Sequence, residues 1–188
     1  MSDSEITGPR TPFVWSVVIA GALAAWAVSF IFISLGSGVG LAISSPYSGP
    51  SSTTMTITGA IWLIITQTAA YTTGGYLAAR LRIRDHIPGP ETMFRDAAHG
   101  FMVWVVGVAI MAIVIAIAAA FAPPSGSSGQ PLSDAARAAA AYLSFWSFMA
   151  LLFGAVAATL AGILGGELRD EEPEVTSAGR RKNAVRAS

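Results

Sequence analysis

The chain has 188 residues, and its composition excludes an ordinary water-soluble domain: hydrophobic residues make up 53% and charged residues only 12%, about half the usual charged fraction. Eleven basic residues balance eleven acidic ones, so no overall charge attracts nucleic acid, and no nucleic-acid partner is expected. The sequence has no cysteine, which excludes disulfides, thiolate catalysis and cysteine metal ligands.

Three long stretches carry no Asp, Glu, Lys or Arg: residues 11–79, 97–133 and 138–166. A soluble fold needs charged surface beside its buried faces, so these stretches indicate hydrocarbon surroundings. The first apolar segment is too long for a cleaved signal peptide and follows Asp3 and Glu5. We therefore expect it to be a retained helix.

The apolar segments predict four helices, each able to cross a hydrocarbon core, over about residues 13–43, 57–79, 97–121 and 135–168. The expected fold class is all-α, a polytopic transmembrane four-helix bundle occupying residues 13–168. Glycines at 36–40 could loosen the first helix, and Ser133 or Asp134 could cap the fourth. We expect residues 1–12 to form a cytoplasmic N-terminal tail and residues 169–188 a disordered charged cytoplasmic tail.

The basic residues predict the orientation of the bundle. If both termini and the 80–96 loop share one side, that side holds all eleven Lys and Arg residues except Arg137. Because Lys and Arg are retained on the cytoplasmic side, we expect both termini in the cytoplasm and the chain in a bacterial inner or plasma membrane.

The ends of the second and fourth helices resemble each other. AAYTTGGYLAARLR aligns with VAATLAGILGGELR, so that Gly75 meets Gly162 and Arg82 meets Arg169. Two tandem helical hairpins would explain this similarity, and the shared composition of apolar helices is the alternative explanation.

Small residues recur every four positions in three of the predicted helices. Their positions are Gly21, Ala25 and Ser29 in the first, Ala112, Ala116 and Ala120 in the third, and Ala150, Gly154, Ala158, Gly162 and Gly166 in the fourth. Such a stripe, similar to a glycine zipper, lets membrane helices approach closely. It serves either packing within the bundle, which we favour, or an interface with a homo-oligomer or a larger membrane complex.

Polar residues near the middle of the second helix include Gln67, Tyr71 and Thr72. They could line a hydrophilic path or form hydrogen bonds between and within helices. We favour hydrogen bonds, because ion and proton pathways usually contain an ionisable residue and none accompanies these.

A charged group lies at the predicted cytoplasmic interface, made of Arg80, Arg82, Arg84, Arg95, Asp96 and His99. It could form a site for a small ligand, proton or metal, or it could begin a helix and form a salt-bridge network. One histidine with scattered carboxylates is weak evidence for a metal. We therefore predict a salt-bridge network and no cofactor, metal or catalytic residue.

The segments WSVVIAGALAA, IWLIITQ with GGYLAARLR, RDAAHGF and AGILGGELRD resemble a group of small bacterial membrane proteins sometimes labelled PhnA-like. The resemblance implies a four-helix membrane bundle and no catalytic residue. The phosphonate chemistry that the label suggests is not expected, because the sequence lacks a multi-ligand metal cluster.

The sequence therefore predicts a non-enzymatic membrane protein, an accessory, assembly or scaffold subunit that packs through small-residue helix faces in the lipid bilayer. A small oligomeric channel or transporter is the second hypothesis. A membrane enzyme that uses Asp96 and His99 is the third.

Overall fold

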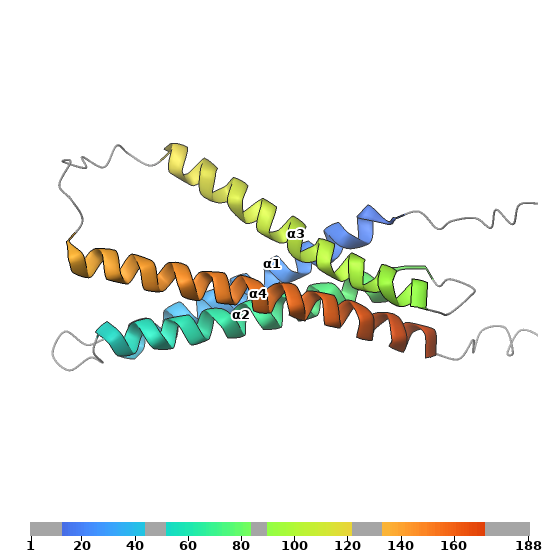
Figure 1. Cartoon of the computed structure of the whole chain (residues 1–188), viewed down its shortest axis with the longest axis horizontal. Helices are drawn as coiled ribbons and strands as arrows, with labels where there is room; N and C mark the ends of the chain where they lie inside the picture. Colours follow the sequence, from blue (N-terminus) through green and yellow to red (C-terminus); the bar gives the residue numbers. More distant parts are fainter. Residues whose placement is uncertain (1–12, 44–51, 84–89, 122–132, 172–188) are drawn as a thin grey trace, which may run out of the picture.

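The computed structural model describes residues 13–43, 52–83, 90–121 and 133–171. These residues form four α-helices and no strand: α1 (Trp15–Ile43), α2 (Ser52–Leu81), α3 (Pro90–Phe121) and α4 (Asp134–Glu171) (Figure 1). The predicted all-α fold class is confirmed. At about 1.5 Å per residue the helices are about 44 to 57 Å long, more than a hydrocarbon core of about 30 Å requires.

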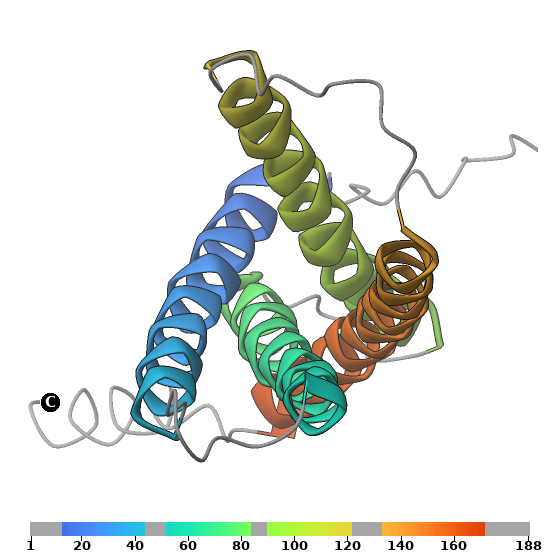
Figure 2. The same cartoon turned by 90° about the vertical axis from the view of Figure 1, so that its left-hand side faces the viewer.

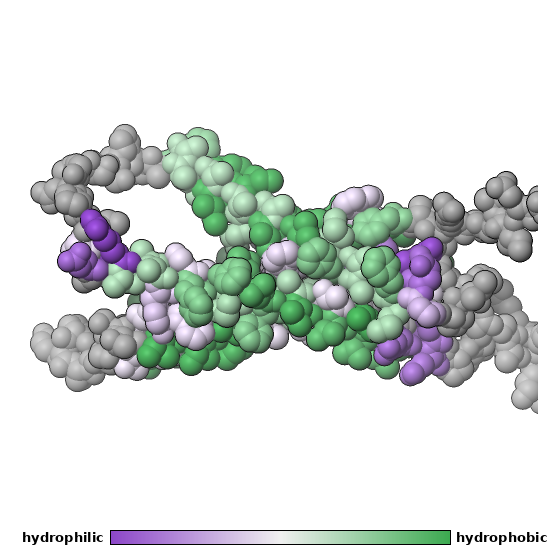
Figure 3. Space-filling model, in the orientation of Figure 1, coloured by the Kyte–Doolittle hydropathy of each residue, from purple (hydrophilic) through white to green (hydrophobic). Residues whose placement is uncertain are grey.

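Three helices, α1, α3 and most of α4, are long and apolar enough to cross a membrane. The second helix is of similar length but richer in Thr and Ser, and it packs most extensively against α4 and then against α1. Figure 3 shows a broad apolar surface with hydrophilic residues gathered toward the two ends of the molecule. These are the features of a membrane protein, and a spanning role for α2 remains a prediction.

The bundle is closed at one end and open at the other. At the closed end α2 and α4 finish and α1 and α3 begin, whereas α3 diverges from α4 toward the open end (Figures 1 and 2). Residues 111–121 of α3 are exposed throughout. The residues that hold the helices together therefore lie in the closed half.

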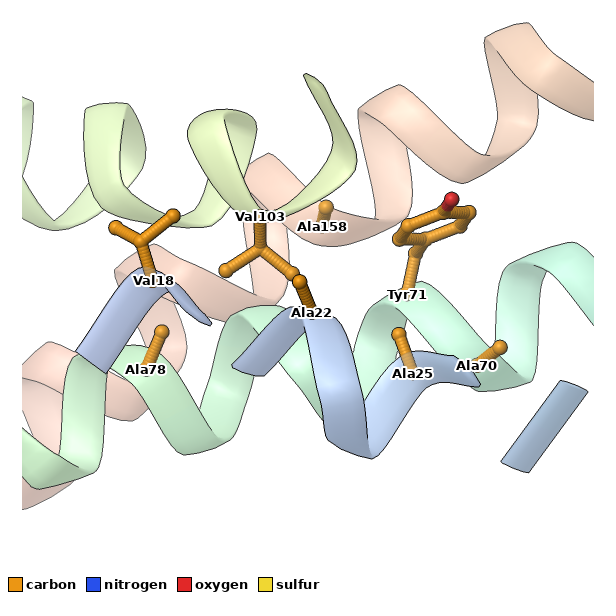
Figure 4. Close-up of a cluster of buried hydrophobic side chains, with 8 residues drawn as sticks. All are labelled: Val18, Ala22, Ala25, Ala70, Tyr71, Ala78, Val103 and Ala158. Atoms are coloured by element: carbon orange, nitrogen blue, oxygen red, sulfur yellow. The ribbon is translucent and has the colours of Figure 1, made fainter. Parts of the chain in front are cut away.

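The core consists mostly of small side chains, which allow the helices to approach closely. It comprises Val18, Ala22 and Ala25 of α1, Ala70, Tyr71 and Ala78 of α2, Val103 of α3 and Ala158 of α4 (Figure 4). Val18 and Val103 are fully buried, and Tyr71 is the one large aromatic side chain in this cluster. All four helices thus contribute to one core.

Several helix boundaries differ from the prediction. The third helix begins at Pro90, not near residue 97, because proline needs no hydrogen-bonded N–H in the first turn and Glu91 stabilises the helix dipole there. Asp96 and His99 therefore lie within α3. The second helix extends beyond 57–79 at both ends, to Ser52 and Leu81.

The remaining boundary predictions concern α1, α4 and the tails. Residues 36–40 are helical, so α1 is continuous. Ser133 caps α4, its Oγ accepting the backbone N–H of Ala136 at 3.2 Å. The sequence predicts a disordered tail from residue 169, but residues 169–171 are helical, because α4 continues to Glu171. The tails at 1–12 and 172–188 lie outside the described residues.

Candidate functional site

A buried carboxylate joins three helices at the closed end. Asp96 of α3 is 2% exposed, and its Oδ1 lies 3.0 Å from Nε of Arg82, which follows α2. Nη1 and Nη2 of Arg169 in α4 donate to Oδ1 and Oδ2 of Asp96 at 3.3 and 3.1 Å. Arg169 also donates from Nη1 to the carbonyl oxygen of Ala79 at 2.9 Å and from Nε to Oδ1 of Asp170 at 2.8 Å. We name Arg82, Asp96, Arg169 and Asp170 the Asp96 cluster.

The Asp96 cluster balances two guanidinium groups against two carboxylates. Because buried charges are very unfavourable without partners, each charge in this cluster depends on the others. Arg169 binds both oxygens of Asp96, a geometry that is stronger and more directional than a single contact. The cluster therefore fixes the ends of α2 and α4 against the second turn of α3.

Glycines of α4 make this contact possible. A Cβ atom at Gly166 would collide with the carboxylate of Asp96, and one at Gly162 would lie 2.5 Å from the Asp96 carbonyl oxygen. A Cβ at Gly100 of α3 would collide with the carbonyl oxygen of Ala158. The predicted small-residue stripe of α4 thus packs against another helix of the same chain, and its glycines bring the two backbones into contact.

His99 contacts a different helix from Asp96. Its Nδ1 lies 2.7 Å from the carbonyl oxygen of Arg95, and because a carbonyl only accepts, Nδ1 carries the proton. The Nε2 atom then accepts the backbone N–H of Val14 at 3.3 Å, and the ring of Phe13 stacks on the imidazole at 4.2 Å between centroids. His99 therefore holds the beginning of α1 against α3.

Two further arginines of the predicted interfacial group, Arg80 and Arg95, lie beside other side chains. Nε of Arg95 pairs with Oε1 of Glu91 at 3.1 Å on the surface, and the guanidinium of Arg80 lies 5.9 Å from the ring centre of Tyr76. Arg84 is outside the described residues. Of the six predicted residues, Arg82 and Asp96 are brought together. Arg169, which the sequence predicts to lie in the tail, pairs with Asp96 as well.

Two of the acidic side chains at the closed end are paired with arginines. The residues that line a surface cavity of about 510 Å³ include four acidic ones, Asp96, Glu167, Asp170 and Glu171. Asp96 is engaged there by two arginines, and Asp170 by one. No group of three or more His, Cys, Asp or Glu side chains within the described ranges could hold a metal ion.

The polar residues of α2 have separate roles. Tyr71 is buried in the core, where its ring packs close to Gly107 of α3 and Gly154 of α4. Thr72 is exposed and Gln67 is half-buried. Thr68 donates its hydroxyl to the Ile64 carbonyl oxygen at 2.8 Å, within its own helix. Thr73 does the same with Ala69 at 2.9 Å.

The three small-residue stripes divide into two kinds. Gly21 and Ala25 of α1 are buried, and a Cβ at Gly21 would lie 2.5 Å from the carbonyl oxygen of Gly74 in α2. The α4 stripe packs on α2 and α3, as described above. By contrast, the α3 stripe of Ala112, Ala116 and Ala120 is exposed.

Comparisons of the chain with protein-family models, with curated proteins and with solved structures give no match. The resemblance to PhnA-like membrane proteins therefore stays a prediction. The function is argued below from the contacts and exposed surfaces of this chain alone.

Proposed function

We propose that this chain is a non-enzymatic accessory or assembly subunit of a bacterial inner membrane, which binds another membrane helix along the open half of α3. The observation that carries the proposal is the exposed stripe of Ala112, Ala116 and Ala120. The third helix is also the most apolar and the least buried of the three candidate spans.

The physical argument depends on what drives helix association in lipid. Apolar side chains gain little by leaving lipid for another helix, so exposed residues such as Ile113 and Ile117 suit the bilayer as they are. Small residues spaced every four positions instead provide a flat strip on which a second backbone packs closely. The corresponding stripes of α1 and α4 have partners within the chain, which leaves the α3 stripe available for another molecule.

The proposal includes four spanning helices with both termini in the cytoplasm. The closed end carries Arg80, Arg82, Arg95 and Arg169, whereas the start of α4 at the open end carries Arg137 alone among the described basic residues. Retention of basic residues in the cytoplasm supports placing the closed end inside. The α3 stripe then lies in the outer half of the bilayer.

A matched pair of substitutions tests the proposal. Ala116→Leu places a branched side chain on the stripe, and Ala27→Leu makes the same change on an exposed face of α1. After mild detergent extraction, Ala116→Leu is expected to reduce the mass of the native complex to that of one chain, while Ala27→Leu leaves the mass unchanged. A wild-type chain that is already monomeric, or an Ala116→Leu complex of full mass, would overturn the proposal.

A further inference from the structure

A cavity of about 290 Å³ lies between α1, α2 and α3, where α3 begins to leave the bundle, and Leu151 of α4 also lines it. Its lining includes Trp26 and Phe30 of α1, Leu63 of α2, and Met111 and Ile115 of α3. Met111 and Ile115 are exposed, so the α3 wall borders the surroundings of the protein. Figure 2 shows α3 angled away from α1 and α2 on this side. A molecule dissolved in the membrane could enter from there.

Thr66 supplies an unsatisfied polar group in the wall of this cavity. It is 2% exposed, and its hydroxyl has no hydrogen-bond partner in the part of the chain that the structure describes. Thr68 and Thr73 on the same helix satisfy their hydroxyls with carbonyl oxygens one turn earlier. Buried hydroxyls are almost always hydrogen-bonded, so Thr66 needs an explanation.

A second cavity, of about 340 Å³, lies between α1 and α2 and is also lined by Thr66. Its lining includes Gly36 and Trp62, and it shares Ile33, Leu63 and Thr66 with the first cavity. Thr66 therefore stands where the two cavities meet, at the middle of α2. An elongated apolar molecule bound beside Thr66 could extend into both cavities.

The polar groups around the first cavity define the chemistry of its occupant. Thr66, Gln67 and Tyr71 can each donate a hydrogen bond, and neither cavity is lined by a charged residue. A charged headgroup would be unfavourable in such surroundings, whereas a neutral carbonyl oxygen would accept from Thr66. Mostly apolar cavities with a few convergent polar groups are typical of small-molecule sites.

We propose that these cavities bind a neutral molecule of the membrane that carries a carbonyl group on an apolar body. The Thr66 side chain turns about χ1, so that its buried hydroxyl donates to the carbonyl oxygen. Two natural sources share this chemistry, a prenylated quinone and a neutral acylglycerol. The cavity shares Ala112 with the α3 stripe, but binding of this molecule does not require a partner helix on that stripe.

Binding is measured on the full chain in dodecyl maltoside, a detergent that has no carbonyl group. One arm titrates decylbenzoquinone and follows quenching of tryptophan fluorescence, since Trp26 and Trp62 line the cavities. The other arm titrates dioctanoylglycerol and follows the midpoint of thermal unfolding. Saturable binding in the first arm assigns a quinone-like ligand, and in the second an acylglycerol.

Thr66→Val removes the hydroxyl and keeps the shape, and Thr68→Val is the matched control. Thr66→Val is expected to raise the Kd about tenfold, the loss of one buried hydrogen bond, while Thr68→Val leaves the Kd unchanged. Val108→Phe, which fills the first cavity from a position outside the α3 stripe, is expected to abolish saturable binding in a chain that still elutes as one species. Failure of both probes to bind the wild type, or equal affinity in the wild type, Thr66→Val and Val108→Phe, would overturn the inference.

Discussion

Arg169, near the end of α4, binds both carboxylate oxygens of Asp96, which lies in the second turn of α3. The two residues are far apart in the sequence, and together with Arg82 they connect three helices through one buried acid. Arg82 and Arg169 are also the residues that the proposed hairpin duplication aligns. The two helix ends therefore converge on the same carboxylate, although the duplication itself remains a hypothesis.

Asp96→Asn is expected to destabilise the protein strongly. The substitution leaves two buried guanidinium groups without their shared anion, and breaking a buried ion pair in this way costs about 3–5 kcal/mol. The free energy of unfolding, measured by titrating SDS into detergent micelles, reports the change.

Glu91→Gln is the control for this prediction, because it removes an acid from the same helix. The Arg95 and Glu91 side chains are 30% and 74% exposed, so their pairing contributes at most about 0.5 kcal/mol. Equal effects of Asp96→Asn and Glu91→Gln would show that the buried cluster does not hold the closed end together.

Gly75→Ala is expected to destabilise the contact between α2 and α4. A Cβ at Gly75 would collide with the carbonyl oxygen of Ala158, and two further backbone atoms of Ala158 lie at 3.0 Å. Backbone atoms cannot move aside as a flexible side chain can, so overpacking is expected to cost about 1–3 kcal/mol. The same SDS titration measures the loss.

Gly59→Ala makes the identical change elsewhere on α2, where nothing lies within 4 Å of the added Cβ. It is expected to be neutral or to stabilise by up to about 1 kcal/mol, because alanine favours helix more than glycine does. If Gly59→Ala were as harmful as Gly75→Ala, helix propensity or insertion would explain the losses better than close packing.

The helices and their small-residue faces can be predicted from the sequence. Runs of uncharged residues, and small residues that recur every four positions, are local properties of the chain. It misses Arg169, which follows the apolar run and looks like the beginning of a charged tail. Its contact with Asp96 depends on how α3 and α4 align, and no local pattern specifies that alignment.

Two further features depend on tertiary structure. Thr66 and Thr68 look equivalent in the sequence, yet only Thr68 bonds its own helix. Likewise, small-residue stripes indicate close packing without saying against what. In the structure the α4 stripe packs against α2 and α3, whereas the α3 stripe is exposed.

His99→Ala is expected to loosen the beginning of α1. The substitution removes the acceptor of the Val14 N–H and the ring on which Phe13 stacks. A lost hydrogen bond of about 1 kcal/mol corresponds to roughly fivefold faster amide exchange at Val14. Hydrogen exchange followed by mass spectrometry measures this rate, and peptides from the middle of α4 serve as the internal control. Unchanged exchange at Val14 would mean that His99 does not hold this end of α1.

The central claim, that the open half of α3 contacts another membrane helix, is tested most directly by photo-crosslinking in native membranes. A photoreactive amino acid replaces Ala116 in one variant and Leu23, which is 59% exposed on the closed half of α1, in the other. The account predicts a defined protein adduct at position 116, with a second copy or a distinct membrane protein, and none at position 23. Lipid adducts alone at both positions would contradict it.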